Sequence, residues 1–286
     1  MKRPQLVALV AGGKLSSSPL AHFSLLSEML GPVKASSYRL ASRIANSLRA
    51  GHPVKDYAEF DACRLILICV PDEALAGTVA ELSSAGISWQ GKSVVLCSTW
   101  RGSGDLGEFS ARGASIASLA AIPGFRDPRY LLEGDKRAIQ ASKRLVETRE
   151  YRSVTIERDL KPLYLAALTC TSSLLIPLVM AAWESLRRAG VTSAMSISIL
   201  EKQLNIGLRA YARGGRRAYT PPPELTSQLR ALSAADPALA NYVEKSYQLA
   251  EQLLEQPQRN AAAAGARTLS VASSQRYRHQ FAATRR

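Results

Sequence analysis

The chain has 286 residues, 47% of them hydrophobic, and a formal net charge of +14. This length and this apolar content favour two folded domains and argue against a disordered chain. Three histidines, and four cysteines without a CxxC pair, leave too few ligands for a zinc site and too few bases for a histidine-based catalytic triad.

The first predicted elements are a strand, a glycine turn and a helix. The apolar run Leu6–Val10 is continuous, which is typical of a strand buried on both faces. Ala11, Gly12 and Gly13 end this run, and leucine and phenylalanine then recur at helical spacing over 16–30. Because the run is much shorter than a signal peptide or an anchor, we expect no export.

Strands and helices continue to alternate through the first half of the chain. We expect further strands at 33–36, 65–70, 93–97 and 114–119. Pro71 ends the most apolar of them, and the acidic Asp72 and Glu73 suit the positive end of the helix that follows. Parallel neighbouring strands require long crossovers, so this alternation predicts an α/β domain with a Rossmann-type, mainly parallel sheet.

The second half of the chain is predicted to be helical. Two strands at 130–134 and 153–156 flank a helix at 136–148, and helical periodicity then covers 159–189, 193–213, 224–232 and 236–255. We therefore expect a dinucleotide-binding domain over 1–157. An all-helical domain, serving dimerisation or substrate binding, would follow over 158–256.

The last segment, 257–286, has arginines as its only fully charged residues and few large apolar side chains. Such a composition cannot offset the entropy of ordering, so we predict a basic, disordered tail. Much of the positive charge therefore belongs to this tail and does not indicate a specific nucleic-acid partner.

One helical segment, Pro162–Trp183, has no charged residue and is bracketed by Lys161 and Glu184. Its length would suit a membrane span, but the polar run Thr169–Ser173 and the proline at 177 raise the cost of placing it in lipid. We expect instead a helix buried in the domain core or in a dimer interface. So much apolar surface predicts a homodimer through the C-terminal helices, with no membrane partner.

The turn after the first strand is the candidate phosphate loop. A Rossmann fingerprint has three glycines here, and only Gly13 matches, because Ala11 and Ser16 replace the outer two. The candidate cofactor-binding residues at this edge of the sheet are Gly12, Gly13, Lys14, Leu15, Val70 and Pro71. The alternative is a loop that only connects strand to helix.

The region after the second strand favours NADP over NAD. NAD-specific folds usually carry an acidic residue there for the ribose hydroxyls, and none stands between Glu28 and Asp56. Hydroxyl and guanidinium groups that could hold a 2′-phosphate occur instead, at Ser36, Ser37, Arg39 and Arg43. The alternative is that both arginines are solvated helix residues.

Three motifs carry a family resemblance: Cys69–Leu75, Leu132–Asp135 and Lys161–Tyr164. Over residues 5–255 the chain resembles Rossmann-like proteins with a C-terminal helical domain of unknown function. These are relatives of the pyrroline-5-carboxylate reductase, ketopantoate reductase and deazaflavin-dependent NADP reductase group. The resemblance implies an NADP-binding domain, a helical dimerisation domain, and a cleft where a small-molecule substrate, still unknown, meets the nicotinamide.

The chain departs from this family at polar positions. Ala120 and Ala121 replace His-Pro, Leu165 replaces a histidine, and Ser173 replaces an asparagine. Lys161 and Tyr164 therefore become the candidate catalytic residues, as an ammonium that holds an acidic substrate or protonates an alkoxide and a hydroxyl that donates beside it. The alternative is a surface lysine and a packed tyrosine.

Two functions follow from these observations. One is an NADP-dependent oxidoreductase that acts on a small carbonyl, imine or hydroxy compound. The other is a catalytically silent relative that senses a nucleotide or serves as a dimeric scaffold. The scattered cysteines fit buried thiols in a reducing compartment, so we expect a cytoplasmic protein.

Overall fold

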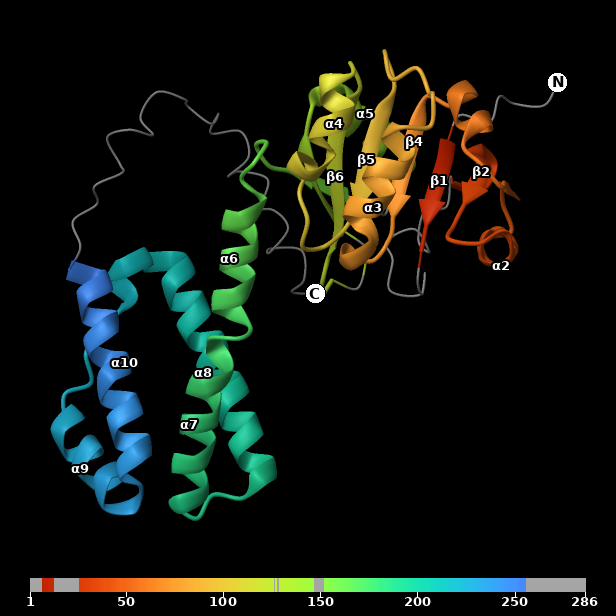
Figure 1. Cartoon of the computed structure of the whole chain (residues 1–286). Helices are drawn as coiled ribbons and strands as arrows, with labels where there is room; N and C mark the ends of the chain where they lie inside the picture. The colour runs from red at the N-terminus through yellow and green to blue at the C-terminus, as the bar shows by residue number, and fades with distance from the viewer. Residues whose placement is uncertain (1–6, 13–25, 126, 128, 147–151, 256–286) are drawn as a thin grey trace, which may run out of the picture. The chain divides into compact units, whose positions relative to one another are not determined.

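The computed structural model describes residues 7–12, 26–125, 127, 129–146 and 152–255. The chain divides into two compact units, Met1–Cys170 and Thr171–Arg286, which we call the sheet unit and the helical unit (Figure 1). The predictions for Gly13, Lys14 and Leu15, and for the tail 257–286, lie outside the described residues.

The sheet unit contains an eight-stranded sheet with the order β3-β2-β1-β4-β5-β6-β7-β8. Its strands are β1 (Val7–Ala11), β2 (Leu30–Lys34), β3 (His52–Pro53), β4 (Leu65–Cys69), β5 (Ser93–Cys97), β6 (Ser115–Ile122), β7 (Arg129–Gly134) and β8 (Arg152–Thr155). The pairs among β1 to β6 are all parallel, in the order typical of dinucleotide-binding folds. β7 pairs antiparallel with β6, and β8 runs parallel to β7. The predicted Rossmann-type α/β class is confirmed.

Helices cover both faces of this sheet. They are α1 (Leu26–Met29), α2 (Tyr38–Leu48), α3 (Asp72–Ser83), α4 (Gly107–Ala111) and α5 (Lys136–Val146). In β4, Leu67 packs in the core that includes α2 and α5, whereas its neighbour Ile66 packs in the core that includes α3 and α4. Because both faces of the central strands are buried, their sequences are continuous apolar runs.

The motif Leu132–Asp135 joins the end of β7 to β6. Gly134 has a φ of +125°, and a Cβ there would lie 2.4 Å from the carbonyl oxygen of Ile116. Only glycine permits this approach. Asp135 then accepts a hydrogen bond from the Ile116 N–H at 2.8 Å and another from Arg158 at 3.0 Å. The motif Leu132–Asp135, one of the three that carry the family resemblance, thus has a structural role at the contact between β7 and β6.

The described helices of the second half are α6 (Lys161–Thr171), α7 (Leu175–Arg188), α8 (Ser193–Gly214), α9 (Leu225–Ala235) and α10 (Pro237–Glu255). Most of α6 belongs to the sheet unit. In the helical unit, α7 packs against α8 and α10, and α9 packs against α10. A turn at 172–174 separates α6 from α7, so the helical segment predicted over 159–189 is two helices.

The apolar side chains of this segment are mostly uncovered within one chain. Taken together, Lys161–Arg188 is long and apolar enough to cross a membrane by length and composition, and 6% of its apolar window is buried. Ala181 is the buried residue of α7 among those described. The expectation of a helix buried in the domain core is therefore wrong for the single chain, and a dimer interface stays a prediction.

Candidate functional site

The loops that follow β1 and β4 touch at the carboxyl edge of the sheet. The Gly12 N–H donates to the carbonyl of Cys69 at 2.9 Å. A Cβ on Gly12 would lie 3.1 Å from Pro71 Cδ and 3.6 Å from Val70 Cγ1. Gly12, Val70 and Pro71 are thus brought together where the strand order reverses, and a Cβ at position 12 would be a tight contact with Pro71.

The predicted 2′-phosphate residues follow β2 at the same edge. Ser36, Ser37, Arg39 and Arg43 are all exposed. Arg39 and Arg43 are one helical turn apart on α2, and neither has an ion-pair partner within the described parts of the chain. The hydroxyl of Ser37 accepts a hydrogen bond from the Leu40 N–H at 3.2 Å and so caps α2. The positive charge of these two arginines is therefore not neutralised by an ion pair among the described residues.

Two further residues at this edge escaped the sequence reasoning. Tyr38, the first residue of α2, is 51% exposed. The Lys55 ammonium lies 5.9 Å from the centre of its ring. Lys55 follows β3, which pairs with β2, so its loop lies near the start of α2.

The loop after β5 is tied to the start of α3. The Ser98 hydroxyl donates to Asp72 Oδ1 at 3.0 Å and accepts from the N–H groups of Trp100 at 3.2 Å and Arg101 at 3.1 Å. One serine side chain thus joins the loops that follow β4 and β5 and bends its own loop.

Lys161, a predicted catalytic residue, is 1% exposed at the start of α6. Its ammonium donates to the carbonyls of Ser98 at 2.7 Å and Arg101 at 2.5 Å, and to the Ser118 hydroxyl at 3.2 Å. A lysine has three such donors, so all of them are in use. Burial lowers the pKa of Lys161 to about 8, although the nearby carboxylate of Glu133 opposes this shift.

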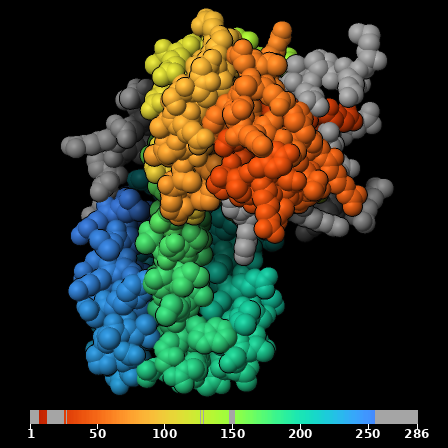
Figure 2. All heavy atoms as spheres, turned by 45° about the vertical axis from the view of Figure 1, so that its right-hand side comes forward, coloured from red at the N-terminus to blue at the C-terminus, as the bar shows by residue number. Residues whose placement is uncertain are grey.

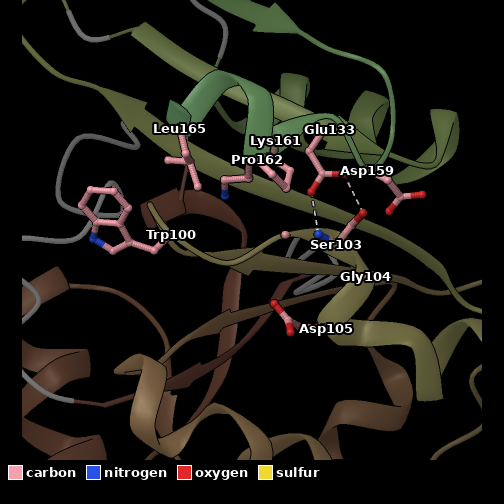
Figure 3. Close-up of a pocket in the computed structure, with 10 residues that line it drawn as sticks. Trp100, Ser103, Gly104, Asp105, Glu133, Asp159, Lys161, Pro162 and Leu165 are labelled. Carbon is pink, nitrogen blue, oxygen red and sulfur yellow. Dashed lines mark hydrogen bonds between the residues drawn. The ribbon is translucent and has the colours of Figure 1, made fainter. Parts of the chain in front are cut away.

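Glu133 on β7 is also 1% exposed. Its carboxylate accepts hydrogen bonds from the Ser103 N–H at 2.5 Å, the Ser103 hydroxyl at 2.6 Å and the Ser118 hydroxyl at 2.7 Å. Ser103 lies in the short 3₁₀ helix η4 (Ser103–Leu106), and Ser118 lies on β6. A continuous network therefore runs from Lys161 through Ser118 and Glu133 to Ser103. Figure 3 shows its last link, between Glu133 and Ser103.

The sequence did contain one signal for this network. Glu133 is a charged residue that directly follows the apolar run Tyr130–Leu132, where a buried ionised side chain requires partners. The motif that contains it was noted only as a mark of family resemblance. Ser103 and Ser118 carried no signal, because serines are common and their pairing depends on the order of the strands.

Lys161 and Glu133 line a cavity of about 300 Å³ in the sheet unit. The cavity is also lined by Trp100, Gly102, Ser103, Gly104, Asp105, Asp159, Pro162 and Leu165. Figure 3 shows Trp100 and Leu165 at one end and Ser103 and Asp159 at the other. Asp159 has a φ of +65°, the left-handed conformation that is uncommon for residues other than glycine.

The second predicted catalytic residue, Tyr164, is not among the described residues that line this cavity. Its hydroxyl is buried and has no hydrogen-bond partner within the described part of the chain. Burial raises the pKa of that hydroxyl. Leu165, which stands where the related family often has a histidine, contributes an apolar wall to the cavity instead. No group of acidic, histidine or cysteine side chains suited to a metal ion occurs among the described residues.

Comparison with sequence families gives one match. Residues 129–223 match a family described as a domain of unknown function, DUF2520. This match begins at β7 and includes the motif Lys161–Tyr164. No curated protein matches the chain.

Solved structures with the same fold include several reductases. One, described as a candidate NADP oxidoreductase of Bacteroides fragilis, is 15% identical, with a TM-score of 0.64 over 87% of this chain and 97% of that one. An imine reductase of Aspergillus terreus is 17% identical, with a TM-score of 0.61 over 91% and 96%. A reductive aminase of Aspergillus terreus, solved with NADPH and ethyl levulinate, is 16% identical, with a TM-score of 0.57 over 86% and 94%. The resemblance to Rossmann-like proteins with a C-terminal helical region is confirmed.

Proposed function

We propose that this Rossmann-type chain, which carries the DUF2520 region at 129–223, is an NADP-dependent oxidoreductase acting on a small carbonyl, imine or hydroxy compound. The observation that carries the proposal is the exposed pair Arg39 and Arg43 at the carboxyl edge of a dinucleotide-type sheet, which has no ion-pair partner among the described residues. The NADP-related structures of the same fold support the class of reaction.

The residues at this edge fit NADP in charge and in space. Arg39 and Arg43 would pair with the 2′-phosphate, with Ser36 beside them, and Lys55 adds a further positive charge. Gly12 has no side chain to collide with Pro71, so the loops after β1 and β4 can lie close together where a pyrophosphate would bind. When bound, the cofactor supplies or accepts the hydride.

The chain's own residues would orient the reactants and hold protons. Lys161 would hold the loop after β5 in place and would not contact the substrate, because its ammonium already donates to Ser98, Arg101 and Ser118. Tyr164 stays the candidate proton donor, since its hydroxyl has no partner among the described residues. The raised pKa of this hydroxyl keeps it protonated at neutral pH.

The assembly we propose is a homodimer through the helical unit. Side chains of α7, α8 and α10 that are 46–68% exposed include Ile176, Met180, Ile197, Leu204, Leu208, Leu249 and Leu253. A groove of about 730 Å³ lies between α7 and α10, and Figure 2 shows these helices side by side. Exposed apolar surface of this extent is typical of a protein interface.

A titration with NADPH and NADH tests the function. We expect NADPH to raise the melting temperature more than NADH does, because only NADPH has a phosphate for the two arginines. In Arg39→Ala/Arg43→Ala the affinity for NADPH should fall about tenfold or more, since a charge-assisted hydrogen bond contributes about 1.5–3 kcal/mol.

The matched control is Arg64→Ala, an exposed arginine just before β4 and so at the opposite edge of the sheet. It should leave NADPH affinity unchanged. Equal losses in both variants would contradict a specific phosphate site.

The second candidate function is a nucleotide-sensing or scaffold protein without activity. Two features favour this function: the apolar Leu165 in the cavity, and the incomplete glycine fingerprint of the first loop, in which only Gly13 matches. Absence of stabilisation by either nucleotide at millimolar concentration would support the scaffold and contradict the oxidoreductase.

A further inference from the structure

The loop between β5 and α4 is held from three sides by buried groups. Ser98 ties its start to Asp72, Lys161 binds two of its carbonyls, and Glu133 binds both polar groups of Ser103. A Cβ on Gly102 would lie 3.3 Å from the Glu133 carboxylate, so the backbone lies close to the charge that holds it. Few surface loops need two buried ionised side chains, and the cost of burying them implies that this conformation matters.

What this loop exposes is an indole ring. Trp100 is 63% exposed, whereas Trp89 in the same unit is 3% exposed and packs on Phe109. Trp100 therefore contributes little to the core. A rigid loop that presents a large aromatic surface is the arrangement of a binding site rather than of a packing element.

The position of Trp100 in the fold indicates which part of a bound dinucleotide it would contact. Gly12 adjoins Pro71, and Asp72 is bonded to Ser98, so the loops after β1, β4 and β5 form one surface. In open parallel sheets, ligands bind outside the carboxyl ends of the strands where the order reverses, here between β1 and β4. Arg39 and Arg43 follow β2, on the other side of this point, at the phosphate end of the proposed site. Trp100 lies at the opposite end.

We propose that Trp100 contacts the nicotinamide ring of the bound cofactor, and that Glu133 and Lys161 are positioning residues that hold the loop of Trp100. The inference rests on the proposed NADP function. The indole face would pack against the planar nicotinamide ring, and it would attract the oxidised ring additionally because that ring carries a positive charge.

Hydrogen bonding separates the positioning role of Lys161 and Glu133 from the ligand-contacting role of Trp100. The ammonium of Lys161 has an acceptor for each of its protons, and the Glu133 carboxylate accepts bonds from two serines. Neither group has a spare donor for a ligand. Trp100, Pro162 and Leu165 are the apolar wall of the cavity, so contact with a ring is the interaction this wall offers.

Acrylamide quenching of tryptophan fluorescence tests the contact in the full-length protein. In a Trp183→Phe background the quenchable emission comes from Trp100, because Trp89 is buried. Saturation with NADP⁺ should reduce the quenching constant by about half or more, since a stacked ring covers one face of the indole. Adenosine 2′,5′-bisphosphate, which lacks the nicotinamide, should raise the melting temperature without protecting Trp100.

The outcomes separate this inference from the function on which it rests. Stabilisation by NADP⁺ without protection of Trp100 would overturn the role of Trp100 and leave the cofactor site intact. No stabilisation by either ligand would overturn both. As a second measurement, Trp100→Ala should weaken NADP⁺ binding about three- to tenfold and leave binding of the bisphosphate unchanged. Equal weakening of both ligands would also overturn it.

A pair of serine variants tests the positioning role. Ser103→Ala removes a hydroxyl that donates to Glu133, whereas Ser142→Ala removes an equally buried hydroxyl that donates within α5. Both should lose stability, and Ser103→Ala should lose more, because its hydroxyl donates to a carboxylate. Only Ser103→Ala should reduce the protection of Trp100 by NADP⁺, and Ser103→Thr should restore it. If NADP⁺ protects Trp100 from quenching equally well in both alanine variants, Glu133 contributes only to stability.

Discussion

The ammonium of Lys161 carries a positive charge into a site that is 1% exposed. Desolvation alone would make this unfavourable, and three acceptors with a nearby carboxylate offset only part of that cost. The same residue is the expected proton donor when it is considered by type and helix position. Its surroundings make it a structural cation whose donors are all in use.

At the residue scale, the low pKa of Lys161 predicts a pH dependence of stability. The pKa is about 8 in the folded chain and 10.5 for an unperturbed lysine, so between these values the unfolded chain binds more protons. The free energy of unfolding should therefore rise with pH across this window. The difference corresponds to roughly 3 kcal/mol at most.

Urea unfolding of the wild type and of Lys161→Met, just below pH 8 and at pH 10.5, measures this contribution. Groups other than Lys161 titrate in both proteins and cancel in the difference. Lys161→Gln provides a second neutral variant in case the methionine variant folds poorly. Parallel stability curves for wild type and variants would contradict a lowered pKa.

At the element scale, α2 combines a structural cap with the proposed phosphate site. Ser37 caps the first turn, while Arg39 and Arg43 stand exposed on the helix that it stabilises. A loss of NADPH binding after a change at Ser37 therefore has two explanations: an unravelled first turn, or a direct effect on the phosphate.

Two substitutions of Ser37 separate these explanations. Ser37→Ala should lower the free energy of unfolding by about 1 kcal/mol, because it removes the cap. Ser37→Asp keeps a capping oxygen and a charge that suits the helix N-terminus, so it should retain stability. The aspartate would repel the 2′-phosphate, and affinity for NADPH should fall relative to NADH. Unchanged cofactor preference in Ser37→Asp would contradict a phosphate site at α2.

At the scale of the whole molecule, the helical unit leaves many large apolar side chains of α7, α8 and α10 exposed in the single chain. The sheet unit, by contrast, buries its strands on both faces. Regular helices with apolar groups at 46–68% exposure favour a partner of similar surface, and a second copy of the same chain supplies one.

The assembly should depend on the exposed apolar side chains of α7 and α10. Met180→Glu and Leu249→Glu place charges on side chains that are 64% and 65% exposed, and should shift a dimer toward monomer in sedimentation experiments. Val154→Glu, at a 46% exposed apolar position of the sheet unit, is the control. A protein recovered only from the membrane fraction, or a monomer before mutation, would contradict the dimer.

The positions of most strands follow from the sequence alone. Residues 65–70 and 94–97 are continuous apolar runs. Such runs are short-range signals because burial on both faces favours an apolar residue at each position. The proposed preference for NADP also depends on a local pattern, namely the residues that follow one strand. The break between α6 and α7 was missed because its turn residues are also compatible with a helix.

The roles of the charged residues were decided by the tertiary structure. Lys161 and Ser98 are 63 residues apart, and Glu133 and Ser103 are 30 apart. No local pattern can pair them, because their contact depends on which strands are neighbours and in which direction β7 runs. The sequence therefore determined the layered α/β architecture and the edge where a dinucleotide would bind. Only long-range packing decided that a buried lysine and glutamate hold the loop that exposes Trp100.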